Sequence, residues 1–334
     1  MTQRSTAEWY RSFGEVEARG HSPLFEEWAL GIADDADVIA LIDDLPPQKR
    51  QPNLVFATAR LLGAPLGGYP EFRAWLLEHW PHVADEAKQR MTQTNEPRRC
   101  GAIVLALGLI AQRIDGPMAI LELGASGGLC LYPDRYSYRY GDGDWLHPAT
   151  GPSTVRIDVE VRGGGVPVPA AIPEISWRAG IDLHPLDVRK VEDVRWLETL
   201  VWPEQTERRD RIRAAIDIVR NDPPKLIRGN AIDHLAAVAA SAPPELTLVV
   251  VTSVMLTYLT YPERMELIAA IRDLGAHGIS LDGIGVRPAV DALHPHPVDG
   301  RFTLSLDGVP LADVGPHGQF IDWFVHPAGP PQES

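Results

Sequence analysis

The chain has 334 residues, of which 45% are hydrophobic and 23% are charged, a composition typical of one large or two ordinary globular domains. Its net charge of −14 argues against nucleic acid as a partner, because proteins that neutralise phosphates usually carry the opposite balance. The two cysteines, Cys100 and Cys130, are too few for a disulfide framework and favour the cytoplasm. We therefore expect the partner to be a small molecule or another protein.

Neither a membrane segment nor a metal site is expected. The polar start MTQRSTAEWYRS lacks the apolar stretch of a signal peptide, and the longest apolar run, residues 100–112, is too short to span a bilayer. No group of histidines and cysteines has metal-ligand spacing, because His294 and His296 are only two residues apart in a Pro-rich loop.

Residues 1–116 are predicted to form a helical N-terminal domain. Apolar residues recur there at three- and four-residue spacing, and Pro and Gly separate the periodic segments. The segments are AEWYRSFGEVEAR, PLFEEWALGIA, ADVIALIDDL, NLVFATARLLG, PEFRAWLLEHW and the buried helix CGAIVLALGLIAQ.

Residues 117–326 change pattern, because short apolar runs alternate with helical stretches. The runs MAILEL, ISWRAGIDL, KLIRGN, LTLVVVTS and GISLDGIGV predict the strands of a parallel α/β sheet. Two alternating runs near 135–168 predict an inserted β-hairpin, and RFTLSLDG with GQFIDWFV predicts a second, antiparallel pair at the end. A mainly parallel sheet ending in an antiparallel pair is typical of class I methyltransferases, whose sheet is of the Rossmann type. The Pro-rich tail, 327–334, is expected to be disordered.

The turn after the first strand, Gly124-Ala125-Ser126-Gly127-Gly128, has two interpretations. It fits the G-x-S-x-G elbow of a serine hydrolase, with Ser126 as nucleophile, Asp282 as acid and His294, His296 or His317 as base. A hydrolase sheet, however, has several strands before its elbow, and everything upstream here is predicted to be helical. Hydrolysis therefore stays a minor alternative.

The turn also fits the glycine-rich cradle of a nucleoside cofactor, which explains more residues. Each predicted strand then places candidate residues at its carboxyl end, where open α/β sheets bind ligands. Asp182, 60 residues beyond Glu122, would accept hydrogen bonds from ribose hydroxyls. The candidate cofactor-binding residues, in chain order, are Glu122, Gly124, Ser126, Gly128, Asp182, Asn230, Ala231 and Ser253. Each also has a purely structural interpretation, as a turn glycine or a helix cap.

Several blocks resemble the family named domain of unknown function 2332. The stretch ELGASGGLCLYPDRYSYRYG resembles the signature ELGASAGLNL–DRY–Y, and TQTNEPRRC resembles the hallmark QTNE--R. RAGIDLHPLDV, RWLETLVWPEQTERRDR and VVTSVMLTYLTYPER resemble further blocks. The resemblance implies a methyltransferase-type Rossmann fold behind a helical N-terminal domain, without an established reaction. The chain departs from the pattern in the region of Gly128, with GASGG for GASAG, at Cys130 in place of Asn, and at Asn230 in place of Asp.

The QTNE block has two interpretations. Thr94 or Asn95 could cap the apolar helix that follows, or Asn95, Glu96 and Arg99 could close the cofactor pocket. The function expected from all these residues is S-adenosylmethionine-dependent methyl transfer to a small molecule. A non-catalytic nucleotide-binding or regulatory protein of the same fold is the alternative. Weak candidates for a catalytic base are Glu96, His184 and Tyr258.

Overall fold

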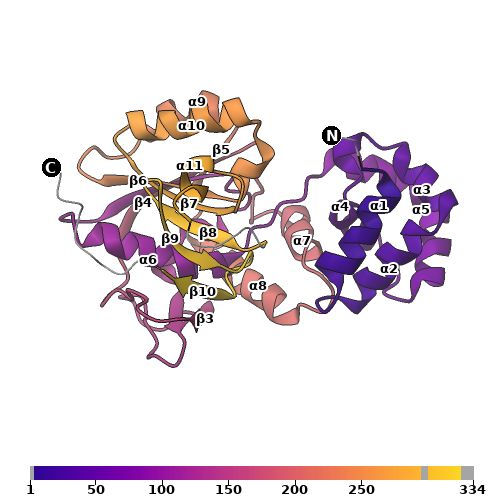
Figure 1. Cartoon of the computed structure of the whole chain (residues 1–334), viewed down its shortest axis with the longest axis horizontal. Helices are drawn as coiled ribbons and strands as arrows, with labels where there is room; N and C mark the ends of the chain where they lie inside the picture. Colours follow the sequence, from indigo (N-terminus) through magenta and orange to yellow (C-terminus); the bar gives the residue numbers. More distant parts are fainter. Residues whose placement is uncertain (1–3, 295–299, 325–334) are drawn as a thin grey trace. The chain divides into compact units, whose positions relative to one another are not determined.

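The structure is a computed structural model and describes residues 4–294 and 300–324 (Figure 1). The chain divides into two compact units. The first comprises residues 1–94 and 187–213, and the second comprises residues 95–186 and 214–334. The predicted tail at 327–334 and His296 lie outside the described residues.

The first unit is helical, as the sequence predicted. Its first three α-helices begin at Ser5, Ser22 and Asp35, whose side chains cap them by accepting backbone N–H bonds. Stacked and edge-on aromatic rings fill its core, and the rings of Trp28 and Phe72 stack at 3.8 Å. The elements are α1 (Thr6–Ser12), η1 (Phe13–Ala18), α2 (Pro23–Ala33), α3 (Ala36–Asp43), η2 (Pro47–Lys49), α4 (Pro52–Leu61), α5 (Tyr69–Gln89) and α7 (Val191–Thr199).

The division differs from the expected boundary at residue 116 because residues 187–213 pack with the first unit. The Trp202 indole donates a hydrogen bond to Asn53, and its ring lies 5.7 Å from that of Phe13. The helix α6 (Cys100–Ala111), which was predicted to lie in the N-terminal domain, belongs to the second unit. This helix is apolar on nearly all sides and is buried against the sheet.

The second unit contains a ten-stranded, mostly parallel sheet in the order β2-β3-β10-β9-β8-β7-β6-β1-β4-β5. The five strands predicted from the alternating pattern are confirmed, and they run parallel to one another. They are β1 (Met118–Leu123), β4 (Ile175–Asp182), β5 (Lys225–Arg228), β6 (Thr247–Ser253) and β7 (His277–Gly283). The protein is therefore a mixed α/β structure.

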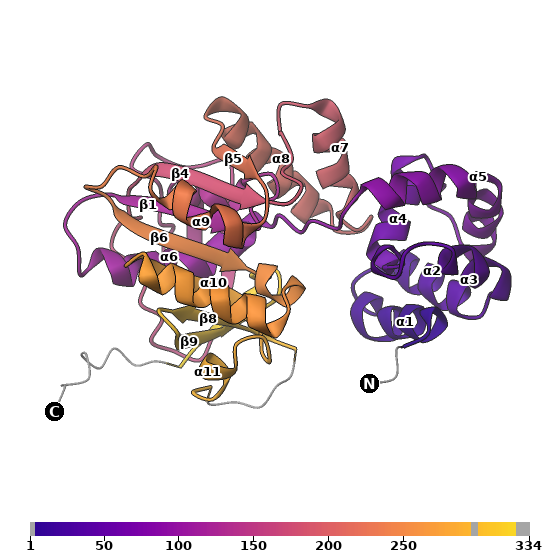
Figure 2. The ribbon, with the colours of Figure 1, turned by 90° about the horizontal axis from the view of Figure 1, so that it is seen from above.

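Helices cover both faces of the sheet (Figures 1 and 2). The helices α9 (Ala231–Ala239) and α10 (Tyr261–Asp273) pack on one face, where Leu121, Leu123 and Val250 meet Leu235 and Leu267 in one apolar core. Helix α6 lies against β3, β7 and β8 on the other face. Helix α8 (Thr206–Asn221) follows α7 in the chain, and the division between the units falls within it. The short helix α11 (Pro288–Asp291) follows β7.

The expected inserted hairpin near 135–168 is wrong. The strands β2 (Ser137–Tyr140) and β3 (Arg156–Arg162) pair in parallel, with Tyr138 level with Ile157. After β2 the chain runs back antiparallel to it and pairs with it at one bridge, between Tyr138 and Leu146. The chain then reverses direction again before β3. Alternation alone gives the two strands but cannot give their relative direction, because the connecting segment is long enough for either.

The predicted antiparallel pair at the C-terminal end is instead a three-stranded meander. The first strand, β8 (Phe302–Leu306), pairs antiparallel with both β7 and β9 (Val309–Val314), and β9 pairs antiparallel with β10 (Phe320–Trp323). The missed strand, VPLADV, contains a proline and lacks strict alternation, which conceals it from pattern analysis. The meander joins β7 to the β3 and β2 side of the sheet.

Candidate functional site

Four polar residues lie at the carboxyl ends of neighbouring parallel strands. Glu122 is near the end of β1, and Asp182 and Ser253 end β4 and β6. Asp282 is the penultimate residue of β7. The chain order of the strands reverses between β1 and β6, and ligands bind open α/β sheets at such a switch point.

The turn after β1 has the unusual backbone that a ligand-binding turn requires. Gly124, Ser126 and Gly128 have φ angles of 79°, 51° and 75°, in the left-handed region that favours glycine. Only two single 3-10 turns follow it, η4 (Leu129–Leu131) and η5 (Pro133–Arg135). Pro133 prevents a longer helix from starting at the turn.

Asp182 fixes the turn to β4. Its Oδ2 accepts a bond from the Ser126 amide at 2.8 Å, and its Oδ1 accepts one from the His184 amide at 2.7 Å. The turn can approach β4 this closely because residue 180 is glycine: a Cβ there would lie 2.4 Å from the Cβ of Ala125. The carboxylate remains half-buried and so faces the edge of the sheet.

The hydrolase arrangement is not assembled around Ser126. A nucleophile elbow exposes its serine, whereas Ser126 is buried and its Oγ has no hydrogen-bond partner among the described residues. The His294 ring lies 2.7 Å from Asp313 on β9 rather than from the expected acid Asp282.

Glu122 and Arg99 form the buried polar centre of the site. Burial raises the pKa of Glu122 well above its usual range, the Cys130 thiol and Asp182 raise it further, and Arg99 opposes them. The Arg99 guanidinium donates to the Pro316 carbonyl at 3.0 Å and to the Ser253 hydroxyl at 3.3 Å. The Oε2 atom of Glu122 has no hydrogen-bond partner among the described residues.

The QTNE block contacts the turn rather than capping α6. The Asn95 side chain accepts a bond from the Leu129 amide at 2.9 Å, so it holds the segment after the glycine turn. The residue that caps the 3-10 turn η3 (Pro97–Arg99) is Glu96, whose carboxylate accepts from the Arg98 amide. Thr94 and Asn95 as caps of the apolar helix were therefore the wrong interpretation.

The remaining predicted residues lie on the surface or cap helices. The Asn230 carboxamide accepts from the Ile232 amide and caps α9, of which Ala231 is the first residue. The exposed His184 ring lies 3.4 Å from an Arg228 nitrogen. Tyr258, in the 3-10 turn η6 (Met255–Tyr258), is 66% exposed. None of these three side chains is brought to the buried centre.

Asp282 is the residue whose place sequence reasoning missed, because it was weighed only as the acid of a hydrolase. It is 3% exposed, and neither carboxylate oxygen has a hydrogen-bond partner among the described residues. Burial raises its pKa to about 7, against the opposing effect of Arg287, Arg99, Arg264 and the nearby Val254 amide. The sequence shows only that an acid is the penultimate residue of GISLDG, as it is of MAILEL.

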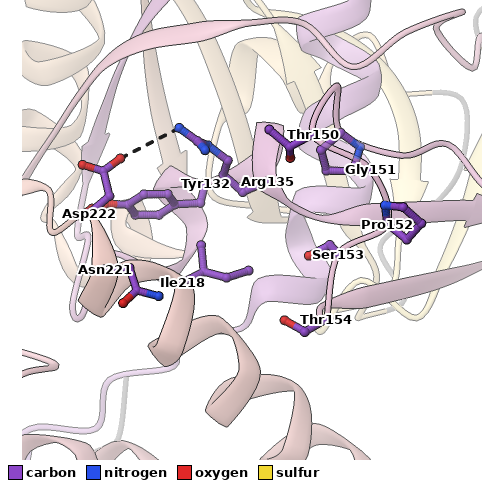
Figure 3. Close-up of a pocket in the computed structure, with 11 residues that line it drawn as sticks. Tyr132, Arg135, Thr150, Gly151, Pro152, Ser153, Thr154, Ile218, Asn221 and Asp222 are labelled. Carbon is purple, nitrogen blue, oxygen red and sulfur yellow. Dashed lines mark hydrogen bonds and ion pairs between the residues drawn. The ribbon is translucent and has the colours of Figure 1, made fainter.

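A separate cavity of about 300 Å³ lies away from these residues (Figure 3). It is bounded by η5, the loop before β3 and the end of α8. Arg135 and Asp222, both in its lining, form an ion pair at 4.0 Å. The neighbouring Asp134 accepts two bonds from Arg178 on β4, at 2.9 and 3.1 Å. The lining residues of the cavity are Tyr132, Arg135, Pro148, Thr150, Gly151, Pro152, Ser153, Thr154, Ile218, Asn221 and Asp222.

Two features are absent from the part of the chain that the structure describes: a metal-binding cluster and a membrane-spanning helix. The described residues contain no group of three or more His, Cys, Asp or Glu side chains placed to hold a metal ion. No helix within residues 4–294 and 300–324 has the length and apolar character needed to cross a membrane.

Comparison with known proteins identifies a family but no activity. No curated protein and no solved structure matches the chain. Residues 7–323 match the family described as "Uncharacterized protein conserved in bacteria (DUF2332)". Because this match spans nearly the whole sequence, the chain belongs to that family.

Proposed function

We propose that the carboxyl edge of β1, β4 and β6 binds S-adenosylmethionine and that the protein transfers its methyl group to a small molecule. The observation that carries this proposal is the bond between Asp182 and the glycine turn at the point where the strand order reverses. The parallel strands run β5-β4-β1-β6-β7, which in chain order is the 3-2-1-4-5 order of a Rossmann sheet. Fold alone gives no reaction, so the proposal depends on the residues.

The residues present fit this cofactor. The half-buried Asp182 carboxylate lies at the carboxyl end of β4, and a carboxylate oxygen can accept more than one hydrogen bond, so ribose hydroxyls are suitable donors to it. The buried Oε2 of Glu122 has no protein donor, so a cationic or hydrogen-bond-donating group of the ligand would satisfy it. A Cβ added at Gly124 would lie 2.8 Å from the Met255 side chain, so Met255 borders the turn.

The bound cofactor supplies an activated methyl group, so the protein's contribution is mainly positioning and exclusion of water. Asp182 would hold the ribose, and Glu122 would favour the positively charged end of the ligand. Arg99, buried between Pro316 and Ser253, would fix the ends of β6 and the loop after β9. These roles need no movement of the sheet.

One alternative uses the same site without catalysis. A nucleotide-binding or regulatory protein would hold the cofactor through Asp182 and show no turnover with any acceptor. The departures at Ser126 and Asn230 favour this alternative, because Asn230 is occupied with capping α9 and not with a base. Serine hydrolysis is not supported by the buried Ser126, and a fluorophosphonate probe that labels Ser126 would reverse that judgement.

Calorimetric titration tests the proposal. We expect S-adenosylmethionine and S-adenosylhomocysteine to bind the wild-type protein, and ATP and NAD to bind at least ten-fold more weakly. Asp182→Ala should lose the binding, whereas Asp158→Ala on the exposed face of β3 should retain it. Equal binding of all four compounds, or no binding of the two adenosyl compounds, would contradict the proposal.

A further inference from the structure

We propose that Asp282 accepts the proton of the methyl acceptor, and that the acceptor is a weakly acidic hydroxyl compound such as a phenol. This inference rests on the proposed function and names the substrate class of the same site. It assigns Asp282 a part that sequence reasoning gave to Glu96, His184 or Tyr258, because Asp282 is buried at the strand edge and neither of its oxygens has a hydrogen-bond partner among the described residues.

The first observation is the concentration of unsatisfied polar atoms around Asp282. Both of its oxygens are buried without a hydrogen-bond partner among the described residues, and so is the Oγ1 of Thr303. Thr303 lies directly opposite Asp282 in the antiparallel pairing of β7 with β8. Because native proteins contain few such atoms, a group of them indicates a place for a polar group that is absent.

The second observation is a strained backbone beside the carboxylate. Val254, the residue after β6, has φ 67° and ψ −16°, which is a genuine outlier for a β-branched side chain. Its amide bonds the Leu281 carbonyl, one residue before Asp282. A strained backbone conformation persists only where the surrounding structure imposes it, and such residues are frequent at functional sites. Val254 and Gly283 are half-exposed, so Asp282 lies just beneath the surface of the carboxyl edge.

The third observation concerns the charges that face Asp282. Arg264 on α10, Arg287 before α11 and Arg99 on η3 all act on its carboxylate. Arg264 donates to the Val286 and Leu259 carbonyls, and Arg287 donates to the Ser280 and Ser305 hydroxyls. Across Thr303 lies Asp313 on β9, which pairs with Arg301 and His294.

These charges decide the class of acceptor. Three cations oppose the approach of an ammonium group and stabilise an oxygen that becomes negative as it loses its proton. Burial brings the pKa of Asp282 to about 7, so the carboxylate can gain and lose a proton near neutral pH. A hydroxyl acceptor uses both properties, whereas a protonated amine is repelled by the three cations before it can lose its proton.

The step balances without a further reactant. The Asp282 carboxylate takes the hydroxyl proton while the acceptor oxygen forms its bond to the methyl carbon. The bond between that carbon and the donor sulfur breaks, and its electron pair stays on the sulfur. The proton on Asp282 then leaves to water, which restores the carboxylate for the next turnover.

The first test follows protonation without any ligand. Infrared difference spectra of the full chain should show a protonated-carboxyl band that titrates near pH 7. Asp282→Asn should remove this titration, whereas Asp158→Asn, an exposed aspartate paired with Arg139, should keep it. A titration that persists unchanged in Asp282→Asn would overturn the inference.

The second test uses methyl-labelled S-adenosylmethionine with catechol, 4-nitrophenol and aniline as acceptors. We expect label in the two hydroxyl compounds and at least a 100-fold fall in kcat/KM for Asp282→Asn, together with loss of the pH dependence near 7. Binding of S-adenosylhomocysteine should stay within two-fold of wild type. Label in aniline alone, in none of the three, or an unchanged rate in Asp282→Asn would overturn the inference. Failure of the wild type to bind S-adenosylhomocysteine would instead overturn the proposed function.

Discussion

The carboxyl ends of β4 and β7 each carry an aspartate, and the two serve opposite purposes. Asp182 is half-buried, and both of its oxygens accept backbone N–H bonds, so its charge is satisfied by the protein and shapes the turn after β1. Asp282 is buried, and neither of its oxygens has a hydrogen-bond partner among the described residues. The same residue type at the carboxyl ends of two parallel strands is therefore a structural anchor in one case and an unsatisfied group in the other.

The difference teaches how to separate the two kinds of residue. An anchor accepts hydrogen bonds from backbone N–H groups and so holds one segment of the chain against another. An unsatisfied acid is destabilising in its ionised form, because burial removes its hydration. Such a cost persists in a folded protein where function requires the group, so substitutions at the β7 end should affect stability and function in opposite directions.

The largest effect on stability is expected from Arg99, whose charge balances the acids on both sides of β6. Arg99→Ala should lower the free energy of unfolding by about 3–5 kcal/mol, because it leaves Glu122 and Asp282 buried without the cation. Arg99→Lys keeps the charge and should cost roughly half of that, since lysine cannot reach Ser253 and Pro316 together. Urea unfolding followed by circular dichroism measures both, and equal losses for the two variants would contradict a role for the charge.

A pH dependence of stability distinguishes Asp282 from Asp182. The pKa of Asp282 is raised to about 7 in the folded protein, so the native state binds more protons than the unfolded chain between pH 4 and 7. Stability contributed by this group is present at low pH and is lost as the pH rises to 7. The free-energy difference between Asp282→Asn and wild type should therefore shift in favour of the variant by about 2–4 kcal/mol across this range.

A difference that stays constant from pH 4 to pH 8 would show that Asp282 does not titrate there. Because burial also raises the pKa of Glu122, only the comparison with Asp282→Asn isolates the one group.

Gly124 tests how tightly the turn is packed. Gly124→Ala should destabilise the protein by about 2 kcal/mol, because φ is 79° and the new Cβ would lie 2.8 Å from Met255. Adding Met255→Ala removes the clash but not the backbone strain, so the double variant should recover part of the loss in a double-mutant cycle. Full additivity of the two changes would mean that Met255 does not limit this position.

The smallest effect is expected at Val254. Val254→Gly removes the strain of φ 67° but increases the flexibility of the unfolded chain, so the net gain should be about 1 kcal/mol. The same change should reduce methyl transfer, because it loosens the backbone beside Asp282. Thermal unfolding and kcat, measured on one preparation, test the expected gain in stability and the expected loss of methyl transfer. A loss of stability would show that Val254 is not strained.

Local patterns predicted the parts of the fold that depend on local physics. The five parallel strands and the helices between them follow from short apolar runs and helical spacing, as in MAILEL and in the segment that forms α10. The direction of β3 relative to β2 and the strand VPLADV were missed, because pairing partners and a proline-containing strand are fixed by distant contacts. The assignment of residues 187–213 to the helical unit depends likewise on Trp202 and its partners.

The candidate site was predictable only where residues act through the backbone. Glycines and an acid at strand ends indicated the turn and Asp182, because turn geometry is visible in sequence. Three features depend on what surrounds each group in three dimensions. They are the lack of hydrogen-bond partners around Asp282, the strain at Val254 and the bond that the Leu129 amide donates to Asn95. Burial without a partner leaves no pattern in the sequence, which is why Asp282 was considered only as a member of a triad.

The most direct test compares the two aspartates in one experiment. The affinity for S-adenosylhomocysteine is measured by calorimetry on wild type, Asp182→Asn and Asp282→Asn, with thermal unfolding as the control for folding. The account predicts at least a ten-fold loss of affinity in Asp182→Asn and less than a two-fold change in Asp282→Asn. Equal losses in both folded variants, or unchanged affinity in Asp182→Asn, would contradict the division between a cofactor anchor on β4 and a proton acceptor on β7.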